Sequence, residues 1–259
     1  MLLFCSCEEY RIAPAAPGAV VAVGNFDGVH RAHQALLAAV KTEAVAAGLA
    51  AVAVSFDPHP SRVLRPDTAP RLITPGMEKI RRLEATGLDA VLLLPFSREL
   101  SQLTPRQFVE QVLVGTLRAR SVHEGENFRF GHRHVGTLAT LRDLGHEIGF
   151  AVHAQSQMTI GGEVVSSSRV RAWIEAGNMA RARHLLGRGF SVRAGLARGR
   201  GIGRQHTVPT LNLEPYPELL PARGVYLSRV ALRGAWFDAL TNVGVRPTFG
   251  DSDSVSVES

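Results

Sequence analysis

The feature that most constrains the fold is an apolar run near the N-terminus that stops at a glycine. Residues 20–23 read Val-Val-Ala-Val, and Gly24 follows them. Consecutive β-branched and apolar residues predict a strand that is buried on both faces, as in a parallel sheet. After a polar turn, apolar residues recur at helical spacing over residues 34–41. The segment therefore predicts a strand, a turn and a helix, with a ligand crevice beyond the strand and phosphate-binding amides at the helix start.

Two histidines, His30 and His33, flank the predicted helix start and are three residues apart. An imidazole can donate a hydrogen bond to a phosphoryl oxygen and, when protonated, offset the charge that develops at an attacked phosphorus. The same residues would also suit a helix end as solvated or capping side chains, because so short a pattern is common by chance. The spacing alone leaves both interpretations open.

The longer run GNFDGVHRAH, residues 24–33, resembles the first signature of the prokaryotic bifunctional riboflavin kinase/FMN adenylyltransferases, the FAD synthetases. That family usually has GNFDGVHxGH, so Ala32 stands where a glycine is common. A methyl group there is expected to crowd the approach of the backbone to a nucleotide. The resemblance implies a nucleotidyltransferase site in which His30 and His33 are catalytic and the substrate-binding residues include Gly24, Asn25, Phe26 and Asp27.

A second buried strand is predicted over residues 51–56, after Gly48 ends the first helix. Strand, helix and strand imply a parallel pair with a right-handed crossover. The turn that follows holds Asp57 and His59 at the carboxyl end of the strand, and plain turn chemistry would account for its two prolines. The run FDPHP also resembles the second signature of the family, which implies that Asp57 and His59 bind the substrate.

Further strands and helices continue the α/β pattern. We expect helices over residues 77–86 and 105–117, the second opened by a capping box at Thr104, strands over 89–96, 120–123 and 151–153, and a hairpin over 159–165. The loop GENFRFG, residues 125–131, resembles the strand-end loop GxDFxFG of the family. Asn127 takes the position where aspartate is common, and the resemblance adds it to the binding residues.

Three consecutive serines and an arginine begin another predicted helix. Hydroxyls, helix amides and a guanidinium make a phosphate site, although a serine-rich N-cap beside a solvated arginine would have the same sequence. The segment resembles the third signature, SSTxxR, which implies that Ser166, Ser167 and Arg169 hold the departing pyrophosphate. The signatures together assign residues 1–187 to an FMN adenylyltransferase domain with a Rossmann-like parallel sheet.

The pattern changes after Gly187 to short alternating strands separated by glycine, proline and polar turns. Strands over 190–196, 210–213, 224–232 and 236–243 predict a small antiparallel β-barrel, so residues 188–259 form a second domain. The run PTLN resembles the PTxN signature of riboflavin kinases, in which Thr210 and Asn212 would hold Mg²⁺ with ATP. Glu258 falls at the carboxylate expected to accept the proton of the riboflavin hydroxyl.

Two features set this second domain apart from the family pattern. Thr207 stands where a glycine is expected before the PTxN signature, and the family continues beyond the position of Ser259 with another strand and a helix. An unclosed barrel would leave a strand edge and apolar surface uncovered. We therefore expect a chain that ends at Ser259 to make FAD from FMN but little FMN from riboflavin.

Composition narrows the class of partner. Lys and Arg number 29 against 23 Asp and Glu, for a formal net charge of +6 that suits anionic ligands. Aromatic residues make up only 6%, which argues against a nucleic-acid surface built on stacking. Cys5 and Cys7 lack the companions of a zinc site, and the apolar N-terminal stretch is too short for a signal peptide or a membrane span. We expect a reduced, cytoplasmic protein, and nothing in the sequence indicates its oligomeric state.

Three functions are compatible with these residues. The first is a bifunctional enzyme of FAD biosynthesis, with ATP, Mg²⁺, riboflavin and FMN as reactants and FAD as product. The second is a monofunctional FMN adenylyltransferase with a vestigial barrel. The third is a non-catalytic flavin- or RNA-binding regulator on the same scaffold. An assay with ATP, Mg²⁺ and either riboflavin or FMN distinguishes them.

Overall fold

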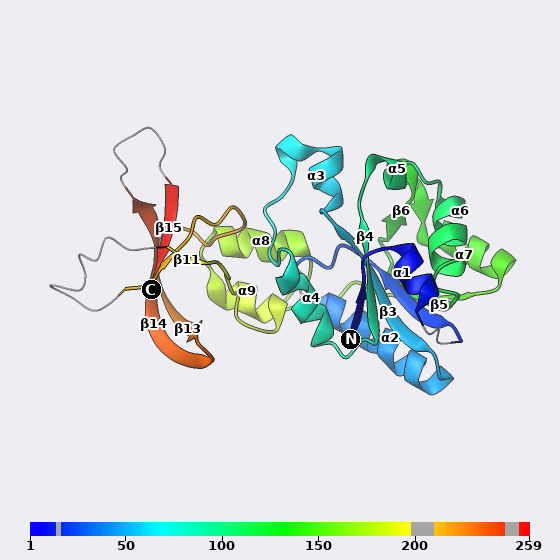
Figure 1. The fold of residues 1–259 in the computed structure, drawn as a ribbon, viewed down its shortest axis with the longest axis horizontal. Helices are drawn as coiled ribbons and strands as arrows, with labels where there is room; N and C mark the ends of the chain where they lie inside the picture. The colour runs from blue at the N-terminus through cyan, green and yellow to red at the C-terminus, as the bar shows by residue number, and fades with distance from the viewer. Residues whose placement is uncertain (14–16, 198–209, 247–253) are drawn as a thin grey trace. The chain divides into compact units, whose positions relative to one another are not determined.

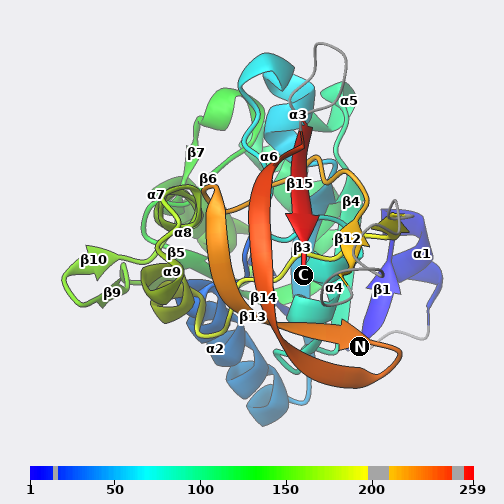
Figure 2. The same cartoon turned by 90° about the vertical axis from the view of Figure 1, so that its left-hand side faces the viewer.

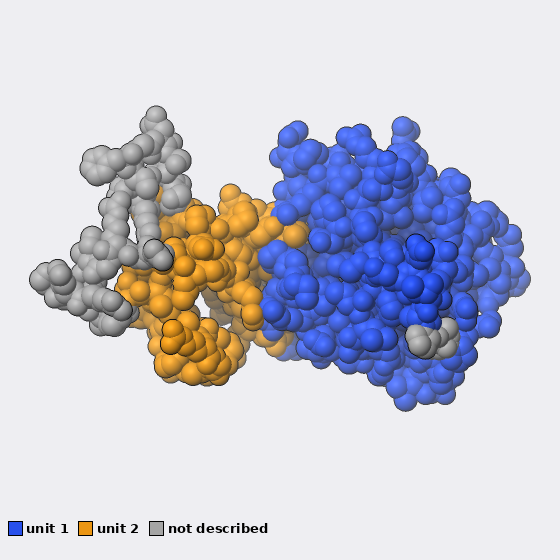
Figure 3. All heavy atoms as spheres, viewed as in Figure 1, with its two compact units in different colours: residues 1–70, 74–166 blue, residues 71–73, 167–259 orange. Residues whose placement is uncertain are grey.

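The fold is known from a computed structural model, which describes residues 1–13, 17–197, 210–246 and 254–259. The chain divides into two compact units (Figure 3). Unit 1 comprises residues 1–70 and 74–166, and unit 2 comprises residues 71–73 and 167–259. Each unit is built around its own sheet, so each is described by itself.

Unit 1 is organised around a six-stranded parallel sheet (Figure 1). Its strand order is β1-β4-β3-β2-β5-β8, and each pair of neighbours runs parallel. The strand β2 lies inside the sheet, and every residue of it is buried because neighbouring strands and both faces cover it. The strands are β1 (Leu2–Phe4), β2 (Ala19–Val23), β3 (Ala50–Asp57), β4 (Ala90–Pro95), β5 (Ala119–Gly125) and β8 (Ala151–Gln155).

The two faces of this sheet bury separate apolar clusters, because successive side chains of a strand point to opposite faces. Val21 and Val23 of β2 pack into one cluster, and Val20 and Ala22 pack into the other. The first cluster includes side chains from α1 (Cys7–Ile12), α6 (Pro105–Phe108), α7 (Leu138–Ile148) and the π-helical segment Val109–Val114. The second cluster includes side chains from α2 (Arg31–Ala47) and α4 (Met77–Glu84).

The remaining elements of unit 1 are short. They are α3 (Pro60–Leu64), α5 (Arg98–Ser101), the 3₁₀ turns Pro66–Thr68 and His132–His134, and two hairpins that pair β6 (Arg129–Phe130) with β7 (Gly136–Thr137) and β9 (Thr159–Ile160) with β10 (Glu163–Val164). Within the described ranges, no helix combines the length and the apolar character that crossing a lipid bilayer would need.

Unit 2 joins a helical pair to an antiparallel sheet. The sheet has the order β11-β12-β15-β14-β13, and its long strands lie side by side in Figure 2. Residues 71–73 also belong to this unit, and the Leu72 amide donates to a carboxylate oxygen of Glu218 at 2.8 Å. The elements are α8 (Ser167–Glu175), α9 (Met179–Leu186), β11 (Leu196–Ala197), β12 (Asn212–Leu213), β13 (Gly224–Leu232), β14 (Ala235–Arg246) and β15 (Ser254–Glu258).

The predicted fold class is confirmed: a parallel α/β sheet precedes an antiparallel one. The sequence missed β1, because three residues in a short apolar stretch carry no strand period, yet they pair with residues 90–92. The capping box at Thr104 is present, but the helix that it opens is α-helical only to Phe108 and then widens into a π-helix. Along the chain, unit 1 ends at Ser166 and unit 2 begins at Ser167, so α8 and α9 are grouped with the antiparallel sheet. The domain boundary expected at residue 187 stays a prediction.

The buried face of α2 provides a test of this packing. Leu37 is fully buried in the cluster that α2 shares with α4, so Leu37→Ala should lower the free energy of unfolding of unit 1 by about 2–5 kcal/mol. Val45, on the same helix, is 68% exposed, and Val45→Ala should cost less than about 1 kcal/mol. Urea unfolding followed by circular dichroism measures both, and equal losses would contradict the assignment of the buried face.

Candidate active site

The turn between β2 and α2 forms one wall of the candidate site. The Gly24 amide donates to the Val54 carbonyl oxygen at 3.0 Å, which extends the pairing with β3 by one residue. A side chain at Gly24 would stand 3.2 Å from the ring of Phe26, which is itself buried with a φ of 48°. A larger residue at this position would therefore need the Phe26 ring, which folds back over the strand end, to shift by a few tenths of an ångström. Asn25, between them, is exposed.

Asp27 holds this turn from inside the protein. Its Oδ1 atom accepts hydrogen bonds from the backbone amide of Thr74 at 2.9 Å and from the Thr74 hydroxyl at 3.4 Å. The Thr74 hydroxyl oxygen in turn accepts from the Gly28 amide at 2.8 Å. Asp27 is only 3% exposed, so the structure gives it a positioning role in the turn. Its predicted contact with substrate stays a prediction.

The two histidines stack on each other at the start of α2. Their ring centroids lie 3.6 Å apart with an interplanar angle of 15°, and Phe26 packs edge-on against His33 at 5.1 Å. His30 is the N-cap residue, and its Nδ1 atom accepts from the His33 amide at 3.4 Å. The Nδ1 atom of His33 is buried without a hydrogen-bond partner. The capping interpretation therefore describes His30, whereas the Nδ1 atom of His33 makes no hydrogen bond within the protein.

The charge state of His33 follows from this packing. Burial lowers the pKa of His33 well below its ordinary value, and the adjacent His30 lowers the pKa further because two stacked imidazolium rings would repel. A neutral imidazole can still donate one hydrogen bond. Such a donor suits a phosphoryl oxygen, which accepts hydrogen bonds only.

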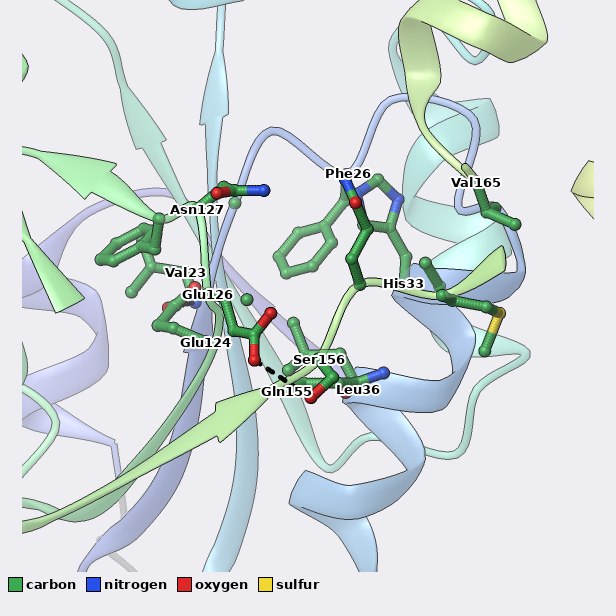
Figure 4. A pocket seen from close by; sticks show the side chains of 16 residues that line it. Val23, Phe26, His33, Leu36, Glu124, Glu126, Asn127, Gln155, Ser156 and Val165 are labelled. Carbon is green, nitrogen blue, oxygen red and sulfur yellow. Dashed lines mark hydrogen bonds between the residues drawn. The ribbon is translucent and has the colours of Figure 1, made fainter. Parts of the chain in front are cut away.

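A cavity of about 230 Å³ opens beside this pair. Phe26 and His33 line one side, and Glu124 and Asn127, from the end of β5, line the opposite side (Figure 4). Ala32, the departure from the family glycine, is also a lining residue. Asn127 is exposed at the cavity mouth, so the structure brings this predicted residue together with Gly24, Phe26 and His33.

Glu124 is a lining residue that the sequence analysis missed. Its Oε1 atom accepts from the Val23 amide at 2.7 Å, and the residue is 2% exposed. Burial raises the pKa of the Glu124 carboxyl well above its usual value, although the Val23 hydrogen bond opposes the shift. The only signal in the sequence was an acidic residue directly after residues 120–123, which were expected to form a strand.

Asp57 and His59 lie at the end of the neighbouring strand β3 and are not among the residues that line the cavity. Asp57 is exposed, and the Nδ1 atom of His59 accepts from the Ser61 amide at 3.2 Å as the N-cap of α3. The nearby Lys79 was also missed by the sequence analysis. Its ammonium group donates to the Phe56 carbonyl oxygen at 2.8 Å, and burial lowers the pKa of Lys79, although the negative charges of Asp57 and Asp27 oppose this shift.

The serine-arginine segment straddles the boundary between the units. Ser166 is the last residue of unit 1, whereas Ser167 and Arg169 lie in the first turn of α8 in unit 2. Both serines are partly buried, and Arg169 is exposed. Their predicted contact with pyrophosphate stays a prediction.

In unit 2, strand pairing aligns the residues expected to serve the kinase reaction. Asn212 of β12 pairs with Glu258 of β15, and Glu258 pairs with Asn242 of β14. Directly paired residues of an antiparallel sheet project from the same face, so these three side chains form one row. Asn212 is 7% exposed, and its Oδ1 atom is buried without a hydrogen-bond partner. Thr210, two residues before it, is exposed, and Thr207 lies outside the described residues.

A parallel α/β sheet with an imidazole pair at a helix start, opening on a cavity at the carboxyl end of its strands, defines a nucleotide-binding domain of the nucleotidyltransferase type. The family model described as FAD synthetase matches residues 12–169, and the model described as riboflavin kinase matches residues 186–259. The chain belongs to the family of bifunctional riboflavin kinase/FMN adenylyltransferases.

Curated relatives agree with this assignment. The bifunctional riboflavin kinase/FMN adenylyltransferase of Pseudomonas fluorescens is 35% identical over 253 residues, which cover 96% of this chain and 80% of the relative. The protein of the same name from Escherichia coli K12 is 35% identical, over 89% of this chain and 74% of the relative. The Bacillus subtilis protein of that name is 32% identical, over 89% of this chain and 73% of the relative.

A solved structure has the same fold. It superposes with a TM-score of 0.85 at 27% identity, covering 99% of this chain and 83% of its own. Its title names a macrolide-efflux protein from Streptococcus pneumoniae. The likeness extends over both units of the present chain.

The buried state of His33 predicts a specific pH dependence. Because its folded pKa lies below the ordinary 6.5, the unfolded chain binds more protons between these two values, and the His33 contribution to stability falls as the pH drops below about 6.5. NMR titration of labelled histidines should give His33 a midpoint below 6.5. The His33 signal is identified as the one that disappears from the spectrum of the His33→Gln variant. In that variant the free energy of unfolding should decline less steeply with acid. A midpoint at or above 6.5 would contradict the burial of the ring.

Proposed function

We propose that this protein makes FAD from riboflavin in two ATP-dependent steps. Unit 1 transfers AMP from ATP to FMN and releases pyrophosphate, and unit 2 phosphorylates riboflavin to FMN. The observation that carries the first step is the His33 ring, whose pKa is lowered and whose Nδ1 atom has no protein partner, at the start of α2 beside a cavity. The relatives from Pseudomonas fluorescens and Escherichia coli are named for both steps, as bifunctional riboflavin kinase/FMN adenylyltransferases.

Adenylyl transfer needs no protein nucleophile. A phosphate oxygen of FMN attacks the α-phosphorus of ATP, a new P–O bond forms, and the bond from the α-phosphorus to the bridging oxygen breaks with loss of pyrophosphate. Catalysis then depends on positioning and on stabilising the charge that spreads over the phosphoryl oxygens. The backbone amides at the start of α2 and the imidazole of His33 supply donors to those oxygens, while the stacked His30 holds the His33 ring in place.

The turn that precedes α2 keeps these donors in position. Asp27 fixes it through Thr74, and Asn25 is exposed beside it for a polar contact with ATP. Asp57 and His59 at the end of β3, Asn127 at the cavity mouth, and Ser166, Ser167 and Arg169 complete the proposed set of substrate-binding residues. This arrangement requires only side chains and amides that the sequence places at strand ends and helix starts.

For the kinase step, we propose that Glu258 accepts the proton of the attacking hydroxyl of riboflavin while Asn212 and Thr210 bind the magnesium complex of ATP. The buried Oδ1 atom of Asn212, which lacks a protein partner, fits a cation, because amide oxygens are ligands that Mg²⁺ accepts. Bound Mg²⁺ would neutralise phosphate charge. The organic substrates of both reactions are ATP and a flavin, so we place the protein in the cytoplasm and assign it no nucleic-acid or membrane partner.

The histidine pair gives the decisive prediction for unit 1. His33→Ala should lower the rate of FAD formation from FMN about 100-fold or more, because it removes a donor to the developing charge. His30→Asn keeps a capping side chain but loses the stacked ring, and it should also be slower. The measurement is chromatographic separation of the flavins after incubation with ATP, Mg²⁺ and FMN.

The control for this prediction is His146→Ala, because His146 is exposed on α7 and is not among the residues that line this cavity. It should leave the rate unchanged. Circular dichroism checks that each variant is folded. A His33→Ala rate equal to that of the parent would remove His33 from the mechanism, and absence of FAD formation by the folded parent would overturn the proposed adenylyl transfer.

For unit 2, Glu258→Gln should reduce riboflavin phosphorylation about 100-fold or more while leaving FAD formation from FMN intact. Gln retains the size and strand pairing of Glu258 but cannot accept the proton. The assay supplies riboflavin in place of FMN and compares variant and parent, in this chain and in the longest product of the gene. If the variant phosphorylates riboflavin as fast as its parent, Glu258 is not the base. If neither this chain nor the longest product of the gene phosphorylates riboflavin, the kinase half of the proposal is overturned.

A further inference from the structure

A cluster of two histidines and a glutamate lies outside the residues that line the cavity. Glu43 is on α2, His123 is on β5, and His153 is on β8. The two histidines are directly paired in the sheet, so their side chains project from the same face. Their rings stack with centroids 4.6 Å apart, and the glutamate of the covering helix reaches both.

We infer that Glu43, His123 and His153 form a binding site for a transition-metal dication, with Zn²⁺ as the preferred ion. One ligand atom from each residue lies within 4.8 Å of the others. The contacts are 2.5 Å from Glu43 Oε2 to His123 Nε2 and 3.5 Å from the same oxygen to His153 Nε2. This proposal goes beyond the proposed function and does not depend on it.

The geometry requires only a small adjustment to hold the ion. Zn²⁺ binds histidine nitrogen and carboxylate oxygen at about 2.0–2.2 Å, so two ligands of a tetrahedral site stand roughly 3.3 Å apart. The contact between Glu43 and His153 already has nearly that separation. The hydrogen bond between Glu43 and His123 would be exchanged for two bonds to the metal, and the pair would separate by less than about 1 Å.

The chemistry of the cluster favours a metal over a lasting ion pair. One carboxylate can neutralise one imidazolium, whereas stacked rings that are both protonated would repel. The Glu43 carboxylate lies within reach of both rings. A dication satisfies it and two neutral imidazoles together.

The donor set also selects the class of ion. Two imidazole nitrogens and one carboxylate oxygen suit Zn²⁺, Co²⁺ or Ni²⁺, whereas Mg²⁺ prefers oxygen ligands. The ion would thus be distinct from the Mg²⁺ that accompanies ATP. His153 is half-exposed, which provides an entry path and leaves room for a water in the fourth position. The bound ion joins one helix to two strands and raises the stability of unit 1.

The test uses untagged protein with Cys5→Ser and Cys7→Ser, so that thiolates do not compete for zinc. Calorimetric titration with Zn²⁺ should show that His153→Ala or Glu43→Gln loses one bound ion or weakens its binding about tenfold or more. Co²⁺ should give visible ligand-field absorption that both variants lose. Mg²⁺ in excess should not displace the ion. The Zn²⁺-dependent rise in melting temperature should fall in parallel.

The matched control is His146→Ala, which removes an exposed histidine of unit 1 that does not belong to the cluster. It should bind Zn²⁺ with the parent's stoichiometry and affinity. The His30 and His33 pair is present in every variant, so any binding there cancels in the comparison. Three results would each overturn the proposal: no Zn²⁺ binding by the parent, unchanged binding in folded His153→Ala, or an equal loss in the control.

Discussion

The hydrogen bonds between the Asp27 carboxylate and Thr74 are the interaction on which the candidate active site depends most. The turn after β2 contains Phe26 and Val29 at positive φ, a backbone conformation that side chains rarely adopt. Such a turn persists only where its surroundings hold it. The buried carboxylate does this by accepting from the Thr74 amide, while the Thr74 hydroxyl accepts from the Gly28 amide. The strain of the turn is thereby offset, and α2 begins where the His33 side chain lines the cavity.

The parallel sheet explains why residues distant in sequence meet at this cavity. All carboxyl ends of parallel strands lie along one edge, so the residues that follow β2 and β5 become neighbours. Phe26 and Glu124 line the same cavity for this reason, although about a hundred residues separate them. The apolar clusters on both faces keep the strands in register, and the crossover helices are fixed by the same packing.

The sequence predicted those parts of the molecule whose signal is local. The apolar run before Gly24 gave the central strand, and alternation gave β13 with its observed bounds. Motif resemblance identified His33 and Asn127 at the cavity. Glu124 and Lys79 were missed because their importance arises from burial, which depends on tertiary packing and leaves no periodic trace. For the same reason, the inward orientation of Asp27 could not be distinguished in the sequence from a contact with substrate.

The row formed by Asn212, Glu258 and Asn242 in unit 2 has a different origin from the site in unit 1, because it is specified by backbone pairing across three strands. Side chains alternate between the faces of a sheet, so the displacement of one strand by a single residue reverses every side chain on it. A one-residue deletion within β15 would turn Glu258 away from Asn212 even though no functional residue had been changed. The spacing of residues along β15 is therefore as much a part of this site as their identity, and selection would act against insertions and deletions there as strongly as against replacement of the glutamate.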